Sequence, residues 1–167
     1  MEIVQYPEPV LKTPSEPVTD VKMIVDHLPE LMKTMHEAKG VGLAANQVGI
    51  AQRFCLINVE GKEGQDLVLL NPEIVEGSGE ATATEGCLSL PGLEVKVKRF
   101  ERVKVRARTL DGKTVEFEAE GLFARAVQHE LDHLNGKLII DHAGPVAKIA
   151  LRSRLKEMEK KFKARKK

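Results

Sequence analysis

Two histidines and a glutamate near residue 130 have the types and the spacing of a metal site. His129-Glu130-Leu131-Asp132-His133 reads H-E-x-x-H, and the apolar residues around it recur at the intervals of a helix. Residues four apart lie on one face of a helix, so both imidazoles can converge on one ion. Glu130 can then reach a water at that ion without being a ligand itself. The motif therefore predicts a metal site.

A catalytic metal site needs a third protein ligand and an open position for water. One class of zinc proteases places a histidine six residues after the second one, but this sequence has Ile139 there. His142 comes three residues too late, and Glu157 and Glu159 stand among basic residues at the spacing of a solvent-exposed helix face. Cys87 is the best remaining candidate, because Gly and Pro flank it on a constrained loop and a thiolate binds zinc or ferrous iron strongly.

The H-E-x-x-H motif is compatible with two further functions. A peptidase that cleaves internal amide bonds would need an open cleft on both sides of the scissile bond. A non-catalytic binding module would replace the water by a fourth protein ligand in a closed structural site. His27 and His36 are poor candidates for that ligand, because they stand on an amphipathic helix as surface or interhelix residues. The motif by itself leaves both alternatives open.

Three helices are expected from the apolar spacing. The first runs from the N-cap Asp20 to Gly40, with Pro29 kinking it or starting a second helix. The second covers residues 122–134 and carries the metal motif, and the third covers residues 148–167.

Strands are expected between these helices. They cover residues 54–59, 67–70, 95–109 and 115–119, and a hairpin turn at Asp111-Gly112 joins the last two. Residues 71–92 are expected to form a glycine-containing connection. This order predicts an α+β fold in which antiparallel strands pack around the central H-E-x-x-H helix, with one helix N-terminal and one C-terminal to that unit.

The composition is that of one globular domain over residues 1–167. The chain is 42% hydrophobic and 31% charged, and no apolar run approaches the ~18–20 residues of a membrane helix. No secretory signal is recognisable at the N-terminus. Two cysteines, Cys55 and Cys87, cannot build a disulfide framework and fit a reducing compartment, with Cys55 in the core. We therefore expect a cytoplasmic protein with no membrane partner.

Positive charge gathers at the C-terminal end. Residues 148–167 hold ten Lys or Arg and two Glu, a net charge of +8, so the rest of the chain carries −7. An apolar stripe of Leu151, Leu155, Met158 and Phe162 predicts that this basic helix docks on the body at least in its first turns. Basic tails often bind polyanions, but a solvated helix end fits the same pattern.

Three motifs together resemble the peptide deformylases. Gly40-Val41-Gly42-Leu43-Ala44-Ala45-Asn46-Gln47 matches their G-x-G-x-A-A-x-Q motif. Glu85-Gly86-Cys87-Leu88-Ser89 matches E-G-C-x-S, and Gln128-His129-Glu130-Leu131-Asp132-His133 matches Q-H-E-x-D-H. The motifs occur in the family's order, and the resemblance covers nearly the whole chain, including a C-terminal helix found in many bacterial members.

The resemblance implies a reaction and the residues that carry it. Members remove the formyl group from the N-terminal formylmethionine of nascent chains, with a metal held by two His and one Cys. Here the ligands would be Cys87, His129 and His133, with water in the fourth position. Glu130 would act as general base and acid while that water attacks the formyl carbon. The side chain of Gln47 and the backbone N–H of Leu88 would stabilise the oxyanion.

The resemblance also implies substrate contacts, a metal and partners. Val41, Leu88 and Val127 would line the methionine pocket, and Gly42 would let the backbone approach the substrate closely. Arg99 matches a position near the substrate backbone. Fe²⁺ is the expected ion, although a Cys-His-His set also suits Zn²⁺, Ni²⁺ or Co²⁺ in purified protein. The expected partners are formylmethionyl N-termini and, through the basic helix over 148–167, the ribosome; no DNA partner is expected.

Overall fold

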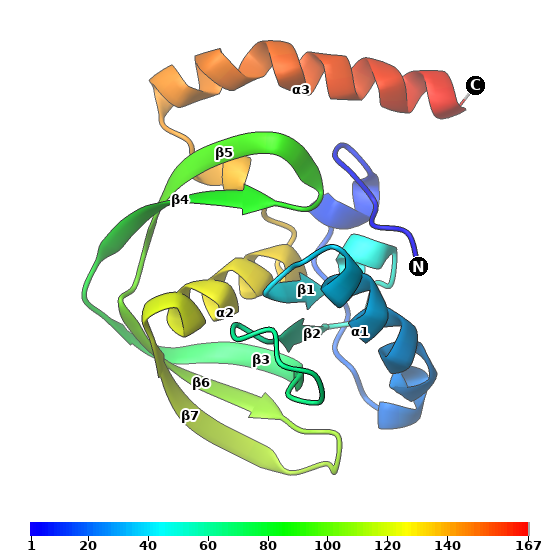
Figure 1. Cartoon of the computed structure of the whole chain (residues 1–167), viewed down its shortest axis with the longest axis vertical. Helices are drawn as coiled ribbons and strands as arrows, with labels where there is room; N and C mark the ends of the chain where they lie inside the picture. The colour runs from blue at the N-terminus through cyan, green and yellow to red at the C-terminus, as the bar shows by residue number, and fades with distance from the viewer. Residues whose placement is uncertain (167) are drawn as a thin grey trace.

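Residues 1–166 are described by a computed structural model, in which two antiparallel sheets enclose a central helix (Figure 1). The larger sheet has the order β1-β2-β3-β6-β7, and the smaller one pairs β4 with β5. The strands are β1 Gly42–Ala44, β2 Phe54–Ile57, β3 Leu67–Ser78, β4 Ala81–Cys87, β5 Leu90–Arg99, β6 Arg102–Arg108 and β7 Thr114–Glu120. The α-helices are α1 Leu28–Glu37, α2 Gly121–Leu134 and α3 Pro145–Lys166.

Helix α2 is the central element, and it lies between the two sheets (Figure 1). Its apolar residues recur three and four apart, and Ala124, Val127 and Leu131 are buried in one cluster with side chains of the larger sheet. The helix ends at Leu134, and Gly136, two residues later, has a φ of +77°. An added Cβ there would lie 2.7 Å from the carbonyl oxygen of Lys12, so glycine is required by both conformation and space. The α+β prediction, with a central helix bearing the motif, is confirmed.

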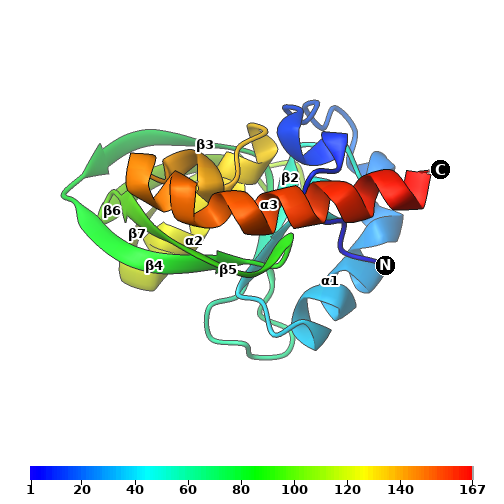
Figure 2. The same ribbon diagram turned by 90° about the horizontal axis from the view of Figure 1, so that it is seen from above.

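Helix α3 lies along the smaller sheet (Figure 2). Met158 is buried, and Leu151 and Leu155 pack on the same apolar cluster, which includes Leu93 and Val95 of β5. The hydroxyl of Tyr6 donates to Glu159 at 2.6 Å, so polar contact adds to the apolar contact. The predicted stripe therefore docks well beyond the first turns, and Phe162 is still half-buried. Lys167, the last residue of the predicted helix, lies outside the described residues.

The N-terminal helix is shorter than the spacing predicts. Residues 21–27 form two short 3₁₀ turns, and α1 begins at Leu28, with Pro29 in its first turn. Proline is well suited to that position, because its missing N–H would have no partner there. Pro29 therefore starts the helix, which is one of the two outcomes expected for it. None of the helices described over residues 1–166 is long and apolar enough to cross a membrane.

The strands differ more from expectation. Residues 71–92, expected as a connection, contain the second half of β3, all of β4 and the start of β5. Most of β4 is exposed, so it has no alternation of buried and exposed residues to mark it as a strand. The predicted strand 95–109 is divided at Phe100 and Glu101 into β5 and β6, which belong to different sheets.

Candidate metal centre

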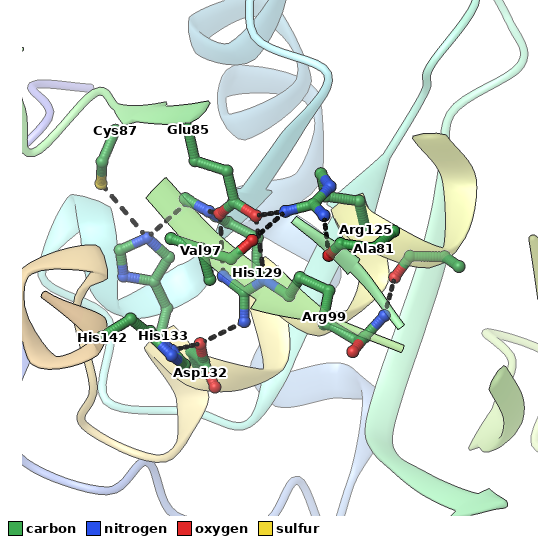
Figure 3. Close-up of polar contacts among 12 residues, drawn as sticks. Ala81, Glu85, Cys87, Val97, Arg99, Arg125, His129, Asp132, His133 and His142 are labelled. Carbon is green, nitrogen blue, oxygen red and sulfur yellow. Dashed lines mark hydrogen bonds and ion pairs between the residues drawn. The ribbon is translucent and has the colours of Figure 1, made fainter. Parts of the chain in front are cut away.

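The three predicted ligands come together at one point of the structure (Figure 3). Cys87 is the last residue of β4, and the two histidines lie one turn apart on α2. Nε2 of His133 is 3.2 Å from Nε2 of His129 and 3.4 Å from Sγ of Cys87. All three donor atoms lie within 4.8 Å of one another, and His133 is almost fully buried.

These distances between donor atoms fit an ion with tetrahedral coordination. With metal–nitrogen bonds of about 2.0–2.1 Å and a metal–sulfur bond of about 2.3 Å, tetrahedral angles place two nitrogens about 3.3 Å apart and a nitrogen and sulfur about 3.6 Å apart. The structure has 3.2 and 3.4 Å for those pairs. A thiolate with two imidazoles is also a donor set that binds divalent transition metals. The three donor atoms present therefore fit a bound metal ion.

The loop that contains the 3₁₀ turn Ala45–Val48 orients Gln47 toward the ligands. The backbone N–H of Ala44 donates to Oε1 of Gln47 at 3.0 Å, which fixes which end of the amide is the oxygen. Nε2 therefore faces Ser89 Oγ, at 3.3 Å, and Cys87 Sγ, at 3.9 Å. Asn46 ties the same loop to α2, because its Nδ2 donates to the carbonyl of His133 at 2.6 Å.

Glu130 is buried beside the ligands. Its Oε2 has no hydrogen-bond partner within residues 1–166, and the residue is 2% exposed. Burial raises the pKa of this carboxyl to about 7, near the value that suits a group exchanging protons at neutral pH. Gly42 makes room for it: a Cβ added there would lie 3.0 Å from three atoms of Glu130.

A buried ion-pair network supports His129 from behind (Figure 3). Oε1 of Glu85 is 2.9 Å from Nδ1 of His129, the ring nitrogen that does not face the other ligands. Arg99 donates two hydrogen bonds to Glu85, at 2.8 and 2.9 Å, and Arg125 donates a third at 2.5 Å. Such an acceptor fixes the tautomer and orientation of a metal-binding histidine.

The network continues to the surface on its other side. Arg99 Nη1 also donates to Asp132 Oδ2 at 2.5 Å, and His142 Nε2 lies 2.7 Å from the same oxygen. Sequence reasoning assigned no role to Glu85, Arg125 or Asp132. One signal was available: Arg125 stands four residues before His129, and so on the same face of α2.

The electrostatics of the centre favour a cation at the donor atoms. Burial lowers the pKa of His133 well below its usual value, so this ring is neutral. For His129, hydrogen bonds with Cys87 and Glu85 outweigh burial and raise the pKa to about 10. Burial would raise the pKa of Glu85, but its contacts with Arg99 and His129 hold it well below its usual range. The carboxylate therefore stays ionised and attracts positive charge to this place.

The centre opens into a pocket of about 590 Å³. Val41, Gly42, Gln47 and Leu88 line it together with Glu130, so these predicted site residues are brought together. Leu88 and Ser89 form the turn between β4 and β5, which leaves the N–H of Leu88 outside the paired register.

Two predicted substrate-binding residues do not reach the pocket wall. The Arg99 side chain is 4% exposed and holds Glu85 and Asp132, and Val127 is fully buried in the cluster between α2 and the larger sheet. Contact of these two residues with substrate stays a prediction that this geometry does not favour.

Comparison with known proteins agrees with the three motifs. The family model described as polypeptide deformylase matches residues 1–148. Peptide deformylase of Acidobacterium capsulatum is 44% identical over 164 residues, covering 95% of both chains, and that of Chromobacterium violaceum is 42% identical over 161 residues, covering 96% of both. A solved peptide deformylase from Plasmodium falciparum superposes with a TM-score of 0.92 at 38% identity, covering 98% of both chains. One from Legionella pneumophila has a TM-score of 0.88 at 38% identity, covering 98% of this chain and 97% of that one.

Proposed function

The chain belongs to the peptide deformylase family, metalloenzymes that remove the formyl group from the N-terminal formylmethionine of newly made polypeptides, and we propose that Cys87, His129 and His133 hold its metal. The observation that carries this proposal is the convergence of three donor atoms next to a pocket, beside a buried carboxylate whose Oε2 has no hydrogen-bond partner within residues 1–166. Membership removes the two alternatives that the motif left open, an internal peptidase and a closed structural site.

Glu130 is the proposed general base. When bound, the metal supplies positive charge that makes water a nucleophile at neutral pH and polarises the formyl oxygen. Glu130 takes the proton of the attacking water and returns it to the leaving amine when the C–N bond breaks. Its burial, its free Oε2 and a pKa of about 7 support this role, because the carboxyl can be both ionised and protonated near neutral pH.

Gln47 and the backbone of Leu88 are the proposed oxyanion donors. The formyl oxygen gains negative charge as the carbon becomes tetrahedral, so donors fixed in advance stabilise the transition state. The hydrogen bond from Ala44 holds the Gln47 amide with its NH₂ toward Cys87. The N–H of Leu88 faces no strand partner, which leaves it available to substrate.

Val41 and Gly42 are the proposed substrate-binding residues at the pocket wall, and Fe²⁺ is the proposed native ion. The thiolate-and-imidazole donor set supports Fe²⁺ and also suits Zn²⁺, Ni²⁺ and Co²⁺. Metal analysis of protein purified without oxygen tests the assignment of iron.

The reaction is tested with a matched pair of substrates. Protein reconstituted with a divalent metal is given formyl-Met-Ala-Ser and acetyl-Met-Ala-Ser, and the free amine released is measured. Rapid release from the formyl peptide alone is expected, because the acetyl methyl group makes the carbonyl less electrophilic and bulkier. Equal release from both peptides, or cleavage after Met, would contradict the proposed function.

The basic end of α3 is the proposed contact with the ribosome. Its apolar stripe packs on the smaller sheet, while every Lys and Arg between residues 160 and 166 is exposed. Binding to rRNA phosphates should weaken steeply as salt rises, through counterion release. Truncation after Phe162 should reduce co-sedimentation with ribosomes at low salt and leave activity on short formyl-peptides intact. Unchanged co-sedimentation would leave this end as solvated surface.

A further inference from the structure

One carboxylate at the pocket wall has no role in the mechanism above. The exposed side chains that line the pocket are Val41, Thr84, Pro91, Leu122 and Glu94, and Glu94 is the one that carries charge. The other ionisable lining residues are buried or half-buried and belong to the centre itself or to the network behind it: Glu85, Cys87, Arg125, His129 and Glu130. Among the residues that line the pocket, therefore, one exposed side chain carries a charge, and that charge is negative.

The sheet register places Glu94 close to the metal ligands. On β5 it stands opposite Gly86 of β4, the residue before Cys87. Side chains directly opposite each other in an antiparallel pair lie on the same face of the sheet. Because Gly86 has no side chain, the residue directly opposite Glu94 does not cover its carboxylate.

Basic groups nearby are already occupied or lie outside the pocket. The guanidinium of Arg125 donates hydrogen bonds to Glu85 and to the backbone carbonyls of Ala81 and Val97. Arg154, on α3, donates to the carbonyl of Pro91 at 3.3 Å and pairs with Glu157. Lys96 is exposed on the same face of β5, two residues from Glu94, but it does not line the pocket, and Lys98 pairs with Glu80 at 3.2 Å. Glu94 itself forms no ion pair within residues 1–166.

We propose that Glu94 makes this deformylase prefer formylmethionyl chains that carry Lys or Arg in the first residues after Met. The inference rests on the proposed function, because it concerns the peptide that occupies the same pocket. A fixed charge at the wall of a cleft with low-dielectric surroundings attracts the opposite charge on a ligand. An exposed pair of this kind changes kcat/KM by about two- to fivefold, and salt reduces the effect.

The test uses three amidated peptides, formyl-Met-Ala-Lys, formyl-Met-Ala-Gln and formyl-Met-Ala-Glu, and a second set with the variable residue directly after Met. They are assayed with wild-type enzyme, Glu94→Gln and Glu94→Lys at low and high salt. Glu118→Gln is the matched control, because it removes one exposed negative charge on β7, away from the pocket.

The wild type and Glu118→Gln should cleave the Lys peptide fastest and the Glu peptide slowest in at least one set. Glu94→Gln should abolish the order, Glu94→Lys should reverse it, and high salt should level it for all enzymes. The Gln peptide should be cleaved by every variant at a similar rate, which shows that the variants fold. If Glu94→Lys keeps the wild-type order in both sets, the inference is wrong while the proposed function stands. If wild-type enzyme leaves the Gln peptide intact, the proposed function itself fails.

Discussion

Oε1 of Glu85 lies 2.9 Å from Nδ1 of His129, on the side of the imidazole opposite the Nε2 that faces Cys87 and His133. The same carboxylate is held by two arginines, so its position is set from three directions. His129 is thereby held with its donor nitrogen pointed at the other two ligands. We therefore expect the proposed metal site to depend on a residue whose contact with it is made through the other ring nitrogen of His129 and not through a donor atom.

Replacing Glu85 by glutamine should weaken metal binding more than it unfolds the protein. The amide keeps an oxygen as acceptor but loses the charge that favours a cation, and changes behind a metal ligand typically cost about 10- to 100-fold in affinity. Competition with a chromophoric chelator measures the affinity, and thermal unfolding of the metal-free protein measures the structural cost. A variant with unchanged affinity would show that the contact with His129 is dispensable.

The two cysteines should behave oppositely. Cys87→Ala removes a predicted ligand, so the purified protein should contain almost no metal and show almost no activity. Cys55→Ala, in the core on β2, should keep a full complement of metal and lose only some stability. Metal content by elemental analysis separates them. Full metal content in Cys87→Ala would move attention to His142 or Glu157 as third ligand.

Glu130→Gln should bind metal normally and lose turnover by about 10²- to 10⁴-fold, because an amide cannot take a proton from water. The substitution preserves volume at a site that is 2% exposed, so little change in unfolding temperature is expected. Metal content, kcat and unfolding temperature are measured on the same sample. If metal is lost together with activity, Glu130 supports the centre and is not the base.

Gly42→Ala should reduce activity although the backbone can accept alanine there. The new Cβ would lie 3.0 Å from Cγ, Cδ and Oε2 of Glu130, so the carboxylate has to move, and a misplaced catalytic group can cost about 10²-fold. Gly40→Ala is the comparison in the same loop. Its Cβ would meet Leu88 Cδ1 at 3.2 Å, the end of a flexible side chain that can turn aside. A larger loss of kcat/KM in Gly40→Ala than in Gly42→Ala would contradict this steric account.

The sequence by itself determined the features that repeat along one element. Helical periodicity places His129 and His133 on one face of α2, and it places the apolar residues of α3 on one face of that helix. Neither placement depends on the surrounding structure. It also determined the fold class, through the order of helices and strands. The sequence did not indicate β4 as a strand. Most residues of this strand in the two-stranded sheet are exposed, so apolar and polar residues do not alternate along it.

Only the tertiary structure decided which residues distant in the sequence meet. Cys87 and His133 are 46 residues apart, and their contact depends on where β4 ends relative to α2. The register of β4 against β5 sets Glu94 opposite Gly86 at the pocket wall, and the crossing of β5 over α2 turns Arg99 inward to Glu85 and Asp132. Backbone geometry fixes a local period for any sequence, whereas register and crossing follow from how the whole core packs, so no short motif could specify them.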